Sequence, residues 1–269
     1  MPVRTPSEVI DLALASGTNK ISLSSPGNYA RFTILSILAG AYIALGGTLS
    51  LVVGFGFPEI SAANPGLQKL LSGLVFPIGL MLVVVVGGEL FTGNNALLMP
   101  GLMRRRFSGL EVLRNWTMVY LGNLVGALAV AYFLVYLPGL TTPEPYNSAI
   151  CGIATNKVYG ATPLAVFLKG IGANWCVCLA VWLALAGKRL SEKLLACQIP
   201  VMAFVILGYE HCVANMFFIP AGMLQGADIN VMDALINNML PATLGNIIGG
   251  ALFVGTLYAY LATPKNRTR

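Results

Sequence analysis

One eight-residue pattern occurs twice in this chain, each time within a strongly apolar stretch. The first copy is Gly87-x-Glu89-x-x-x-x-Asn94 and the second is Gly208-x-Glu210-x-x-x-x-Asn215, an offset of 121 residues. A second pattern agrees, because residues 121–126 (Leu-Gly-Asn-Leu-Val-Gly) recur as residues 244–249 (Leu-Gly-Asn-Ile-Ile-Gly), an offset of 123 residues. Two independent matches at nearly one offset indicate a chain built from two related halves.

The composition places these halves in a membrane. Of the 269 residues, 57% are hydrophobic and 10% are charged, which excludes an ordinary soluble domain. The formal net charge is +6, but the basic residues lie between apolar runs instead of forming a basic patch with aromatic residues. We therefore expect lipid headgroups, and not nucleic acid, as their partners.

Six apolar runs are long enough to span a hydrocarbon core of about 30 Å. The predicted spans are Phe32 to Phe57, Leu70 to Leu90, Trp116 to Leu137, Pro163 to Ala186, Leu194 to Tyr209, and Met239 to Leu261. An even number of spans puts both termini on one side, and lysine and arginine mark that side as cytoplasmic, with thirteen cations against two (Lys69 and Lys157). Lys169, within the fourth span, is expected to snorkel outward or to face a wet cavity.

These spans predict an all-α polytopic membrane protein with two inverted three-helix repeats. The expected units are a cytoplasmic N-terminal segment (1–30), a first repeat (31–137), an external connecting loop (138–162), a second repeat (163–262) and a cytoplasmic tail (263–269). Because each repeat has an odd number of spans, the two must insert in opposite orientations. In the N-terminal segment, Thr5 and Glu8 form a predicted capping box for a short amphipathic helix that ends near Gly17.

The duplicated motif predicts that the second and fifth spans are broken helices. Each motif is followed by a further short apolar piece, and irregular backbone at membrane depth survives only where protein or a cavity surrounds it. Glu89 and Glu210 are the acidic residues within the spans. We expect a structural role for both, accepting hydrogen bonds from backbone freed by the break. Asn94 and Asn215 close the motif and are expected to stabilise the same breaks.

His211 is the single histidine of the chain and lies inside the second motif. A titratable group at membrane depth is costly unless it has a function, so we predict a role in a pore. The first motif has Leu90 at the matching position, so the two halves differ here.

Enzymatic signatures are absent from the sequence. The five cysteines are scattered, and with one histidine the chain has neither a zinc-binding constellation nor a catalytic triad. Gly54-x-Gly56 lacks the remaining features of a dinucleotide site. We predict no catalytic residue, no metal and no cofactor.

The residues around the two breaks and in the sixth span resemble the formate/nitrite transporter family. The similarity rests on residues 89–94 (Glu-Leu-Phe-Thr-Gly-Asn), 208–216 (Gly-Tyr-Glu-His-Cys-Val-Ala-Asn-Met) and 244–250, and it extends over all six spans. The resemblance implies an aquaporin-like protomer, a homopentamer with one pore in each protomer, and a lipid-filled central hole. It also implies passage of small monovalent weak-acid anions across a prokaryotic cytoplasmic membrane.

The resemblance also assigns roles to matching positions. Phe76, Leu80 and Leu90 resemble a cytoplasmic constriction and Phe204 an external one, with His211 in a dry chamber between them. Thr92 resembles the hydroxyl that bonds the substrate or His211. The remaining matches are Asn174 and Asn246, as amides offered to the same chamber, and Lys157, as an external vestibule lysine that attracts anions.

A transport mechanism follows from elementary electrostatics. A bare anion in a narrow apolar passage is penalised by roughly tens of kcal/mol, so its charge must be neutralised. Either the anion gains proton affinity as its surroundings become less polar, or His211 supplies the proton. We expect formate as the substrate, ahead of nitrite and then hydrosulfide. Two other classes are a neutral-solute pore and a non-transporting membrane enzyme or sensor. The first predicts paired pore motifs and the second a metal cluster or an appended soluble domain, and the sequence shows none of these features.

Overall fold

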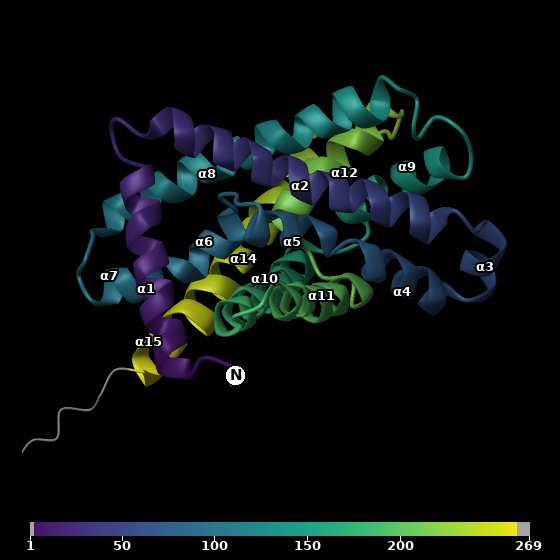
Figure 1. Cartoon of the computed structure of the whole chain (residues 1–269). Coiled ribbons are helices and arrows are strands. Elements are labelled where there is room, and N and C mark those ends of the chain that lie inside the picture. Colours follow the sequence, from purple (N-terminus) through teal and green to yellow (C-terminus); the bar gives the residue numbers. More distant parts are fainter. Residues whose placement is uncertain (1–2, 263–269) are drawn as a thin grey trace, which may run out of the picture.

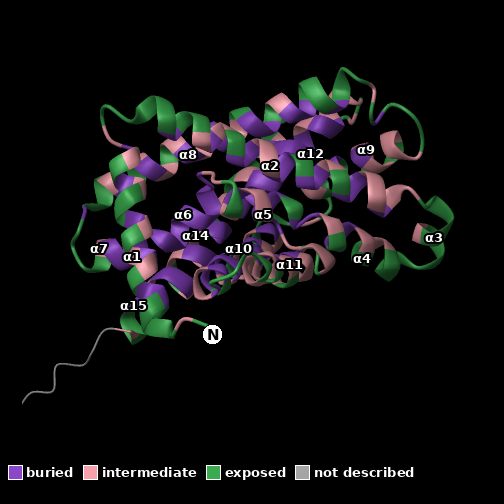
Figure 2. Cartoon of the chain, viewed as in Figure 1, coloured by how far each residue is buried: buried purple, intermediate pink, exposed green. Residues whose placement is uncertain are grey.

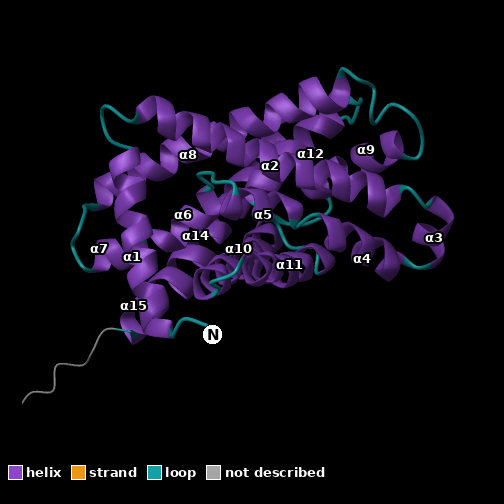
Figure 3. Ribbon diagram, in the orientation of Figure 1, coloured by secondary structure: helices purple, strands orange, loops and turns teal. Residues whose placement is uncertain are grey.

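The structure, a computed structural model, describes residues 3–262, and this part of the chain consists of helices and loops (Figure 1, Figure 3). The predicted cytoplasmic tail, 263–269, lies outside the described residues. Five helical segments are long and apolar enough to cross a membrane. Two of them are single helices, Tyr29–Phe55 (α2) and Pro163–Ala186 (α10). Two consist of two helices each: Pro65–Val85 contains α4 (Pro65–Val75) and α5 (Ile78–Val85), and Gly109–Tyr136 contains α8 (Gly109–Ala129) and η1 (Val130–Tyr136). The last, Val231–Leu261, consists of α13 (Val231–Asp233), η2 (Ala234–Met239), α14 (Leu240–Ile247), η3 (Ile248–Thr256) and α15 (Leu257–Leu261).

The remaining predicted span, Leu194 to Tyr209, corresponds to one shorter helix. Helix α11 (Leu190–Ile206) has 17 residues, about 26 Å at 1.5 Å per residue, and it is followed by α12 (Cys212–Leu224). The chain is therefore an all-helical, multi-pass membrane protein.

Both predicted helix breaks are present, and their backbone geometry is similar. Helix α5 ends at Val85 and α6 (Phe91–Leu97) begins after Leu90, which is extended at φ −104° and ψ 124°. In the second copy, α11 ends at Ile206 and α12 begins after His211, at φ −102° and ψ 112°. Gly87 and Gly208 have φ values of 106° and 68°, which glycine adopts without the strain that a Cβ would cause.

The N-terminal helix is longer than the sequence indicated. The capping box of Thr5 and Glu8 is formed, but α1 runs from Pro6 to Leu23, so the expected end at Gly17 is wrong. Gly17 is needed for close packing instead, because a Cβ there would collide with the backbone carbonyl of Leu97 in α6. The glycine lets α1 lie directly against the first helix break.

The segment expected to be a connecting loop, 138–162, contains a helix. Helix α9 (Tyr146–Tyr159) buries Ile150, Ala154 and Val158, which are spaced four residues apart on one helical face. This face packs on α12 and η2. The short apolar stripe was visible in the sequence, but it is too short to register as a span.

Helices at the two ends of the bundle frame the breaks. In Figure 1, α1, α7 (Met99–Met103) and α15 gather at the left end, while α3 (Pro58–Ala63), α4 and α9 lie at the right. Close contacts between the longer helices depend on small residues, since a Cβ on Gly126 or Gly249 would overlap the carbonyl of Ile37 or Ile171. Every residue of α6 is buried, whereas apolar side chains are exposed on the outer helices (Figure 2).

Candidate functional site

The two breaks meet inside the bundle. The Thr92 side chain, in the first turn of α6, lies 2.9 Å from the ring of His211, measured from Oγ1 to Nε2. Both residues are buried, with exposed fractions of 0% and 2%. A pair separated by 119 positions in the chain thus joins the duplicated motifs, as the family resemblance suggested for Thr92.

The surroundings of His211 fix its ring and its tautomer. The backbone N–H of Ala214 donates to Nδ1 at 3.1 Å, so His211 is the N-cap of α12 and Nδ1 is an acceptor. In the neutral ring the hydrogen is then on Nε2, which donates to the Thr92 hydroxyl. Phe204 stacks on the other side, with ring centroids 5.8 Å apart and planes inclined by 22°. Thr92 keeps its own hydroxyl hydrogen for another acceptor.

A very small chamber lies next to this pair. Its volume is about 10 Å³, room for about one water molecule, and the surface exposed to it is apolar, although His211 is among the residues around it. The lining residues are Ile43, Phe76, Leu80, Leu90, Val177, Val201, Phe204 and His211. The four predicted constriction residues therefore surround one chamber with His211.

Larger cavities approach the chamber from two sides. The cavity lined by Lys157, Glu210 and Phe204, here called the Lys157 cavity, has a volume of about 370 Å³. The cavity lined by Lys20, Glu89 and Leu90, here called the Lys20 cavity, has a volume of about 440 Å³. The apolar chamber separates the two.

Phe76 contacts the residues of both expected constrictions. It lines the Lys157 cavity together with Phe204, and the two rings form an edge-to-face pair with centroids 5.7 Å apart. Leu80 and Leu90 line the Lys20 cavity. Phe76 thus lines the chamber together with the two leucines, as expected for one constriction, and it also contacts Phe204 at the Lys157 cavity.

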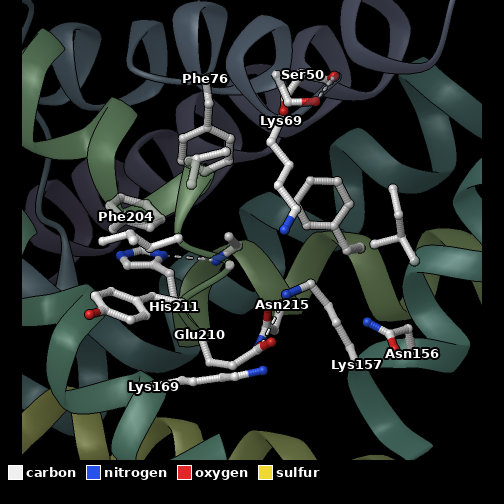
Figure 4. A pocket seen from close by; sticks show the side chains of 18 of the residues that line it. Ser50, Lys69, Phe76, Asn156, Lys157, Lys169, Phe204, Glu210, His211 and Asn215 are labelled. Atoms are coloured by element: carbon white, nitrogen blue, oxygen red, sulfur yellow. Dashed lines mark hydrogen bonds and ion pairs between the residues drawn. The ribbon is translucent and has the colours of Figure 1, made fainter. Parts of the chain in front are cut away.

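Beside the Lys157 cavity, a buried ion pair stabilises the second break. Lys157 Nζ lies 3.0 Å from Glu210 Oε2, and the same oxygen accepts from Asn215 Nδ2 at 2.7 Å and from Asn238 Nδ2 at 3.2 Å. Asn215 also donates to Asn238 Oδ1 at 2.6 Å, and Asn238 donates to the Lys157 carbonyl at 2.9 Å. The expected vestibule lysine is thus also part of the cavity wall (Figure 4).

The first break carries a similar set of contacts. Lys20 Nζ lies 2.8 Å from Glu89 Oε2, which also accepts from Asn94 Nδ2 at 2.8 Å. Asn94 donates to Asn115 Oδ1 at 3.0 Å, and Asn115 donates to the Lys20 carbonyl at 3.2 Å. Both carboxylates therefore bind lysine and asparagine side chains. The expectation that they accept hydrogen bonds from backbone freed by the break is wrong.

Another asparagine satisfies the freed backbone of the first break. Asn123 accepts from the Phe91 N–H at 2.9 Å and donates to the carbonyls of Glu89 at 2.8 Å and Ser36 at 2.7 Å. A side-chain amide with one acceptor and two donor hydrogens suits an interrupted helix, where N–H and C=O groups both need partners.

Asn246 does the same for the second break. It accepts from the Cys212 N–H at 2.9 Å and donates to the carbonyls of Glu210 and Gly170, each at 2.8 Å. Asn174 donates to the carbonyls of Thr92 at 3.2 Å and Asn246 at 2.6 Å. Neither amide is among the residues lining the chamber, contrary to the expectation, because backbone groups already use their hydrogens.

Four residues that hold the two breaks were not predicted from the sequence. Lys20, Asn115 and Asn238 complete the two ion-pair clusters, and Asn123 holds the first break. Asn123 had a visible signal, since it lies in the recurring 121–126 motif. Lys20 had no such signal. It lies 137 residues before Lys157, whereas the two copies of the motif are offset by 121 residues, and the residues around the two lysines share no pattern.

Both cavities carry excess positive charge. The Lys157 cavity is lined by three cations, one of them Lys169, and one carboxylate, a formal charge of 3 − 1 = +2. The Lys20 cavity is lined by Lys20, Arg31 and Glu89, a formal charge of 2 − 1 = +1. Cationic clefts with low-dielectric walls concentrate anions. A multi-pass helical protein with two such cavities ending on a narrow apolar chamber has the architecture of a membrane channel or transporter.

Comparison with known proteins identifies the particular family. The Formate/nitrite transporter family model matches residues 7–260, and the chain therefore belongs to this family. It is 44% identical over 241 residues to a probable formate transporter of Methanothermobacter thermautotrophicus, covering 84% of this chain and 87% of the relative. It is 40% identical over 262 residues to a formate channel of Bacillus thuringiensis, covering 97% and 96%.

Solved structures agree with this assignment. An ion channel of the same family superposes with a TM-score of 0.85 at 32% identity, covering 95% of this chain and 99% of that one. A structure described as a pentameric formate channel with formate bound gives a TM-score of 0.78 at 34% identity, covering 88% and 98%.

Proposed function

We propose that this protein is a membrane channel for small monovalent weak-acid anions and that formate is its substrate. The observation that carries the proposal is the sequence of compartments along the bundle, in which two cationic cavities flank an apolar chamber that contains one imidazole. Relatives named as formate channels support the choice of substrate. Nitrite and hydrosulfide are the alternatives within the same family.

The apolar chamber makes charge neutralisation the central step. The +2 and +1 cavities attract the anion, but its bare charge is strongly disfavoured between Phe204 and Leu90. The permeant acquires a proton as its surroundings become less polar, or through His211, and crosses as the neutral acid. Because Nε2 of His211 donates to the Thr92 hydroxyl, Thr92, which is buried and lines none of the three cavities, acts on the substrate through the His211 ring that it holds in place.

We further propose six spans arranged as two inverted repeats with an aquaporin-like course. The similar hydrogen-bond sets at the two breaks support this, because α1 supplies the lysine of one set and α9 the lysine of the other. Both termini and the Lys20 cavity then face the cytoplasm, and the Lys157 cavity faces outward, in keeping with the distribution of cations. The similarity to a pentameric formate channel supports a homopentamer. A prokaryotic inner membrane and lipid in the central hole are part of the same proposal and rest on the family resemblance of the sequence.

Flux measurements test the proposal directly. Proteoliposomes containing the purified protein and a pH-sensitive dye would be supplied with formate, nitrite or hydrosulfide at equal concentration. We expect rapid formate uptake with internal acidification. Movement of nitrite or hydrosulfide with inert formate would overturn the substrate, and the absence of all three fluxes would overturn the channel itself.

The role of His211 needs a separate variant. His211→Asn retains an N-cap oxygen for α12 while removing the titratable ring. We expect formate flux to lose its dependence on pH in this variant. Cys212→Ser, next to it in sequence, is the matched control and is expected to retain the wild-type profile. An unchanged pH profile in His211→Asn would eliminate the imidazole from the mechanism.

A further inference from the structure

Two lysines in the Lys157 cavity have no carboxylate partner. Lys69 on α4 and Lys169 on α10 line this cavity together with Lys157 on α9, and Figure 4 shows the three side chains pointing into it from different elements. Glu210 is the carboxylate of the lining, and its ion pair is with Lys157 at 3.0 Å. Within residues 3–262, neither Lys69 nor Lys169 forms an ion pair.

The opposite cavity has one additional cation instead of two. There, Lys20 is paired with Glu89 at 2.8 Å, which leaves Arg31 as the additional cation. The ion-pair clusters are therefore duplicated in the two halves, whereas the pair of uncompensated ammonium groups occurs at one mouth. A monovalent permeant that enters the Lys157 cavity can compensate one of those two charges and leaves the other unmatched.

The cavity also has space for a ligand larger than the substrate. Its volume of about 370 Å³ falls within the usual range for small-molecule pockets, while the chamber behind it holds about 10 Å³. Asn156 adds an amide to the same wall, on the side of Lys157 (Figure 4). Charge, volume and polar lining thus converge on an anion with two separated negative groups.

We propose that the Lys157 cavity binds a small dicarboxylate between Lys69 and Lys169. Such a ligand compensates both unpaired cations at once, and its attraction to the cavity is about twice that of a monovalent anion at the same distance. It would need two protons to become neutral, and it exceeds the chamber, so it stays at the mouth. The bound dicarboxylate excludes the permeant anion and acts as a blocker.

Binding is tested on the purified full-length protein in detergent by titration calorimetry. Succinate is the probe, and butyrate, with one carboxylate on the same four-carbon chain, is the comparison at equal ionic strength. We expect succinate to bind at least tenfold more tightly than butyrate. The double variant Lys69→Gln/Lys169→Gln is expected to lose at least tenfold in succinate affinity, whereas Lys188→Gln, an exposed lysine outside both cavities, retains it. Equal affinities for the two probes would overturn the proposal.

Inhibition of flux provides the functional test and depends on the proposed function. Succinate at the same concentration on both sides of the proteoliposome membrane removes any effect of insertion orientation. Formate flux of each variant is referred to its own rate without succinate, and we expect the half-inhibitory concentration to rise at least tenfold in the double variant. An unchanged value would contradict the proposal. Lysine-dependent succinate binding without formate flux would instead refute the proposed channel and leave the binding site intact.

A fold control keeps this test interpretable. The unfolding temperature of each variant in detergent identifies loss of folded protein, and the single variant Lys69→Gln, at an exposed position, serves if the double variant does not fold. The single variant removes one of the two charges, so we expect it to weaken succinate binding at least threefold. Full wild-type affinity in folded Lys69→Gln would exclude Lys69 from the site.

Discussion

The two helix breaks have nearly the same scaffold and differ in their chemistry. In each, a lysine from a peripheral helix pairs with the motif glutamate, and two asparagines complete the cluster. At the N-cap the two copies diverge, since Leu90 offers no side-chain hydrogen bond to α6 while His211 caps α12 and reaches Thr92. The duplicated part maintains broken helices in a membrane. The residue that differs is the one that brings an imidazole to the chamber.

The largest expected effect tests whether the two ion pairs are equivalent. Lys20→Met and Lys157→Met each leave a buried carboxylate without its partner, which destabilises a protein by about 3–5 kcal/mol. Chemical unfolding in detergent would measure both, with Lys188→Met as the control. We expect similar losses, largely restored for the second cluster by Lys157→Met/Glu210→Leu. A loss in one half alone would show that the clusters are not equivalent.

A smaller loss is expected at the asparagines that hold the backbone. Asn123→Leu and Asn246→Leu each leave buried N–H and C=O groups unsatisfied, and we expect a destabilisation of about 2–3 kcal/mol. The exposed Asn156→Leu is a suitable control. Hydrogen exchange at the Phe91 and Cys212 amides should accelerate in the respective variant. Unaltered exchange would mean that the break is held by other contacts.

The N-cap difference can be removed by a single substitution. His211→Leu copies the first break into the second and loses the cap of α12, which typically destabilises a helix by about 1 kcal/mol. His211→Asn retains a capping oxygen and should be close to the wild type in unfolding free energy. If the two variants are equally stable, the hydrogen bond from the Ala214 N–H to Nδ1 does not contribute to the stability of α12. The assignment of the ring hydrogen of His211 to Nε2 then loses its support.

The smallest expected effect concerns the first turn of α1, the helix that carries Lys20. The backbone N–H of Thr5 and then its hydroxyl donate to the Glu8 carboxylate, and these bonds lower the pKa of Glu8 below its ordinary value of 4.5. A lowered pKa means that the stabilisation is present above 4.5 and is lost as the pH falls through the value in the folded protein. Hydrogen exchange should therefore show fraying of the first turn of α1 below pH 4.5. Glu8→Gln should lack this dependence.

Local physics explains what could be predicted at the breaks. Gly87 and Gly208 mark the positive φ positions, and buried Glu89 and Glu210 require partners wherever they lie. Each inference depends on one residue and its immediate neighbours. Which groups become the partners of the two glutamates depends on residues far away in the chain. Backbone groups were expected there, and lysine and asparagine side chains are found.

Long-range packing explains the contacts that were not predicted. Lys20 meets Glu89 because α1 crosses the first break, and the close approach of Gly17 to Leu97 permits that crossing. Phe76 faces Phe204 because α4 and α5 both pack on α11. Neither arrangement leaves a periodic signal in the sequence.

The sequence by itself determined that this is a multi-pass membrane protein with a motif repeated at two interrupted helices, because hydrocarbon solvent and backbone hydrogen bonding constrain each segment separately. The tertiary structure decided which groups meet. The contact between Thr92 and His211, the pairing of the lysines and the volumes of the cavities all join residues far apart in the chain. Such contacts arise only when packed helices exclude water and bring the two halves together, and no local pattern encodes them.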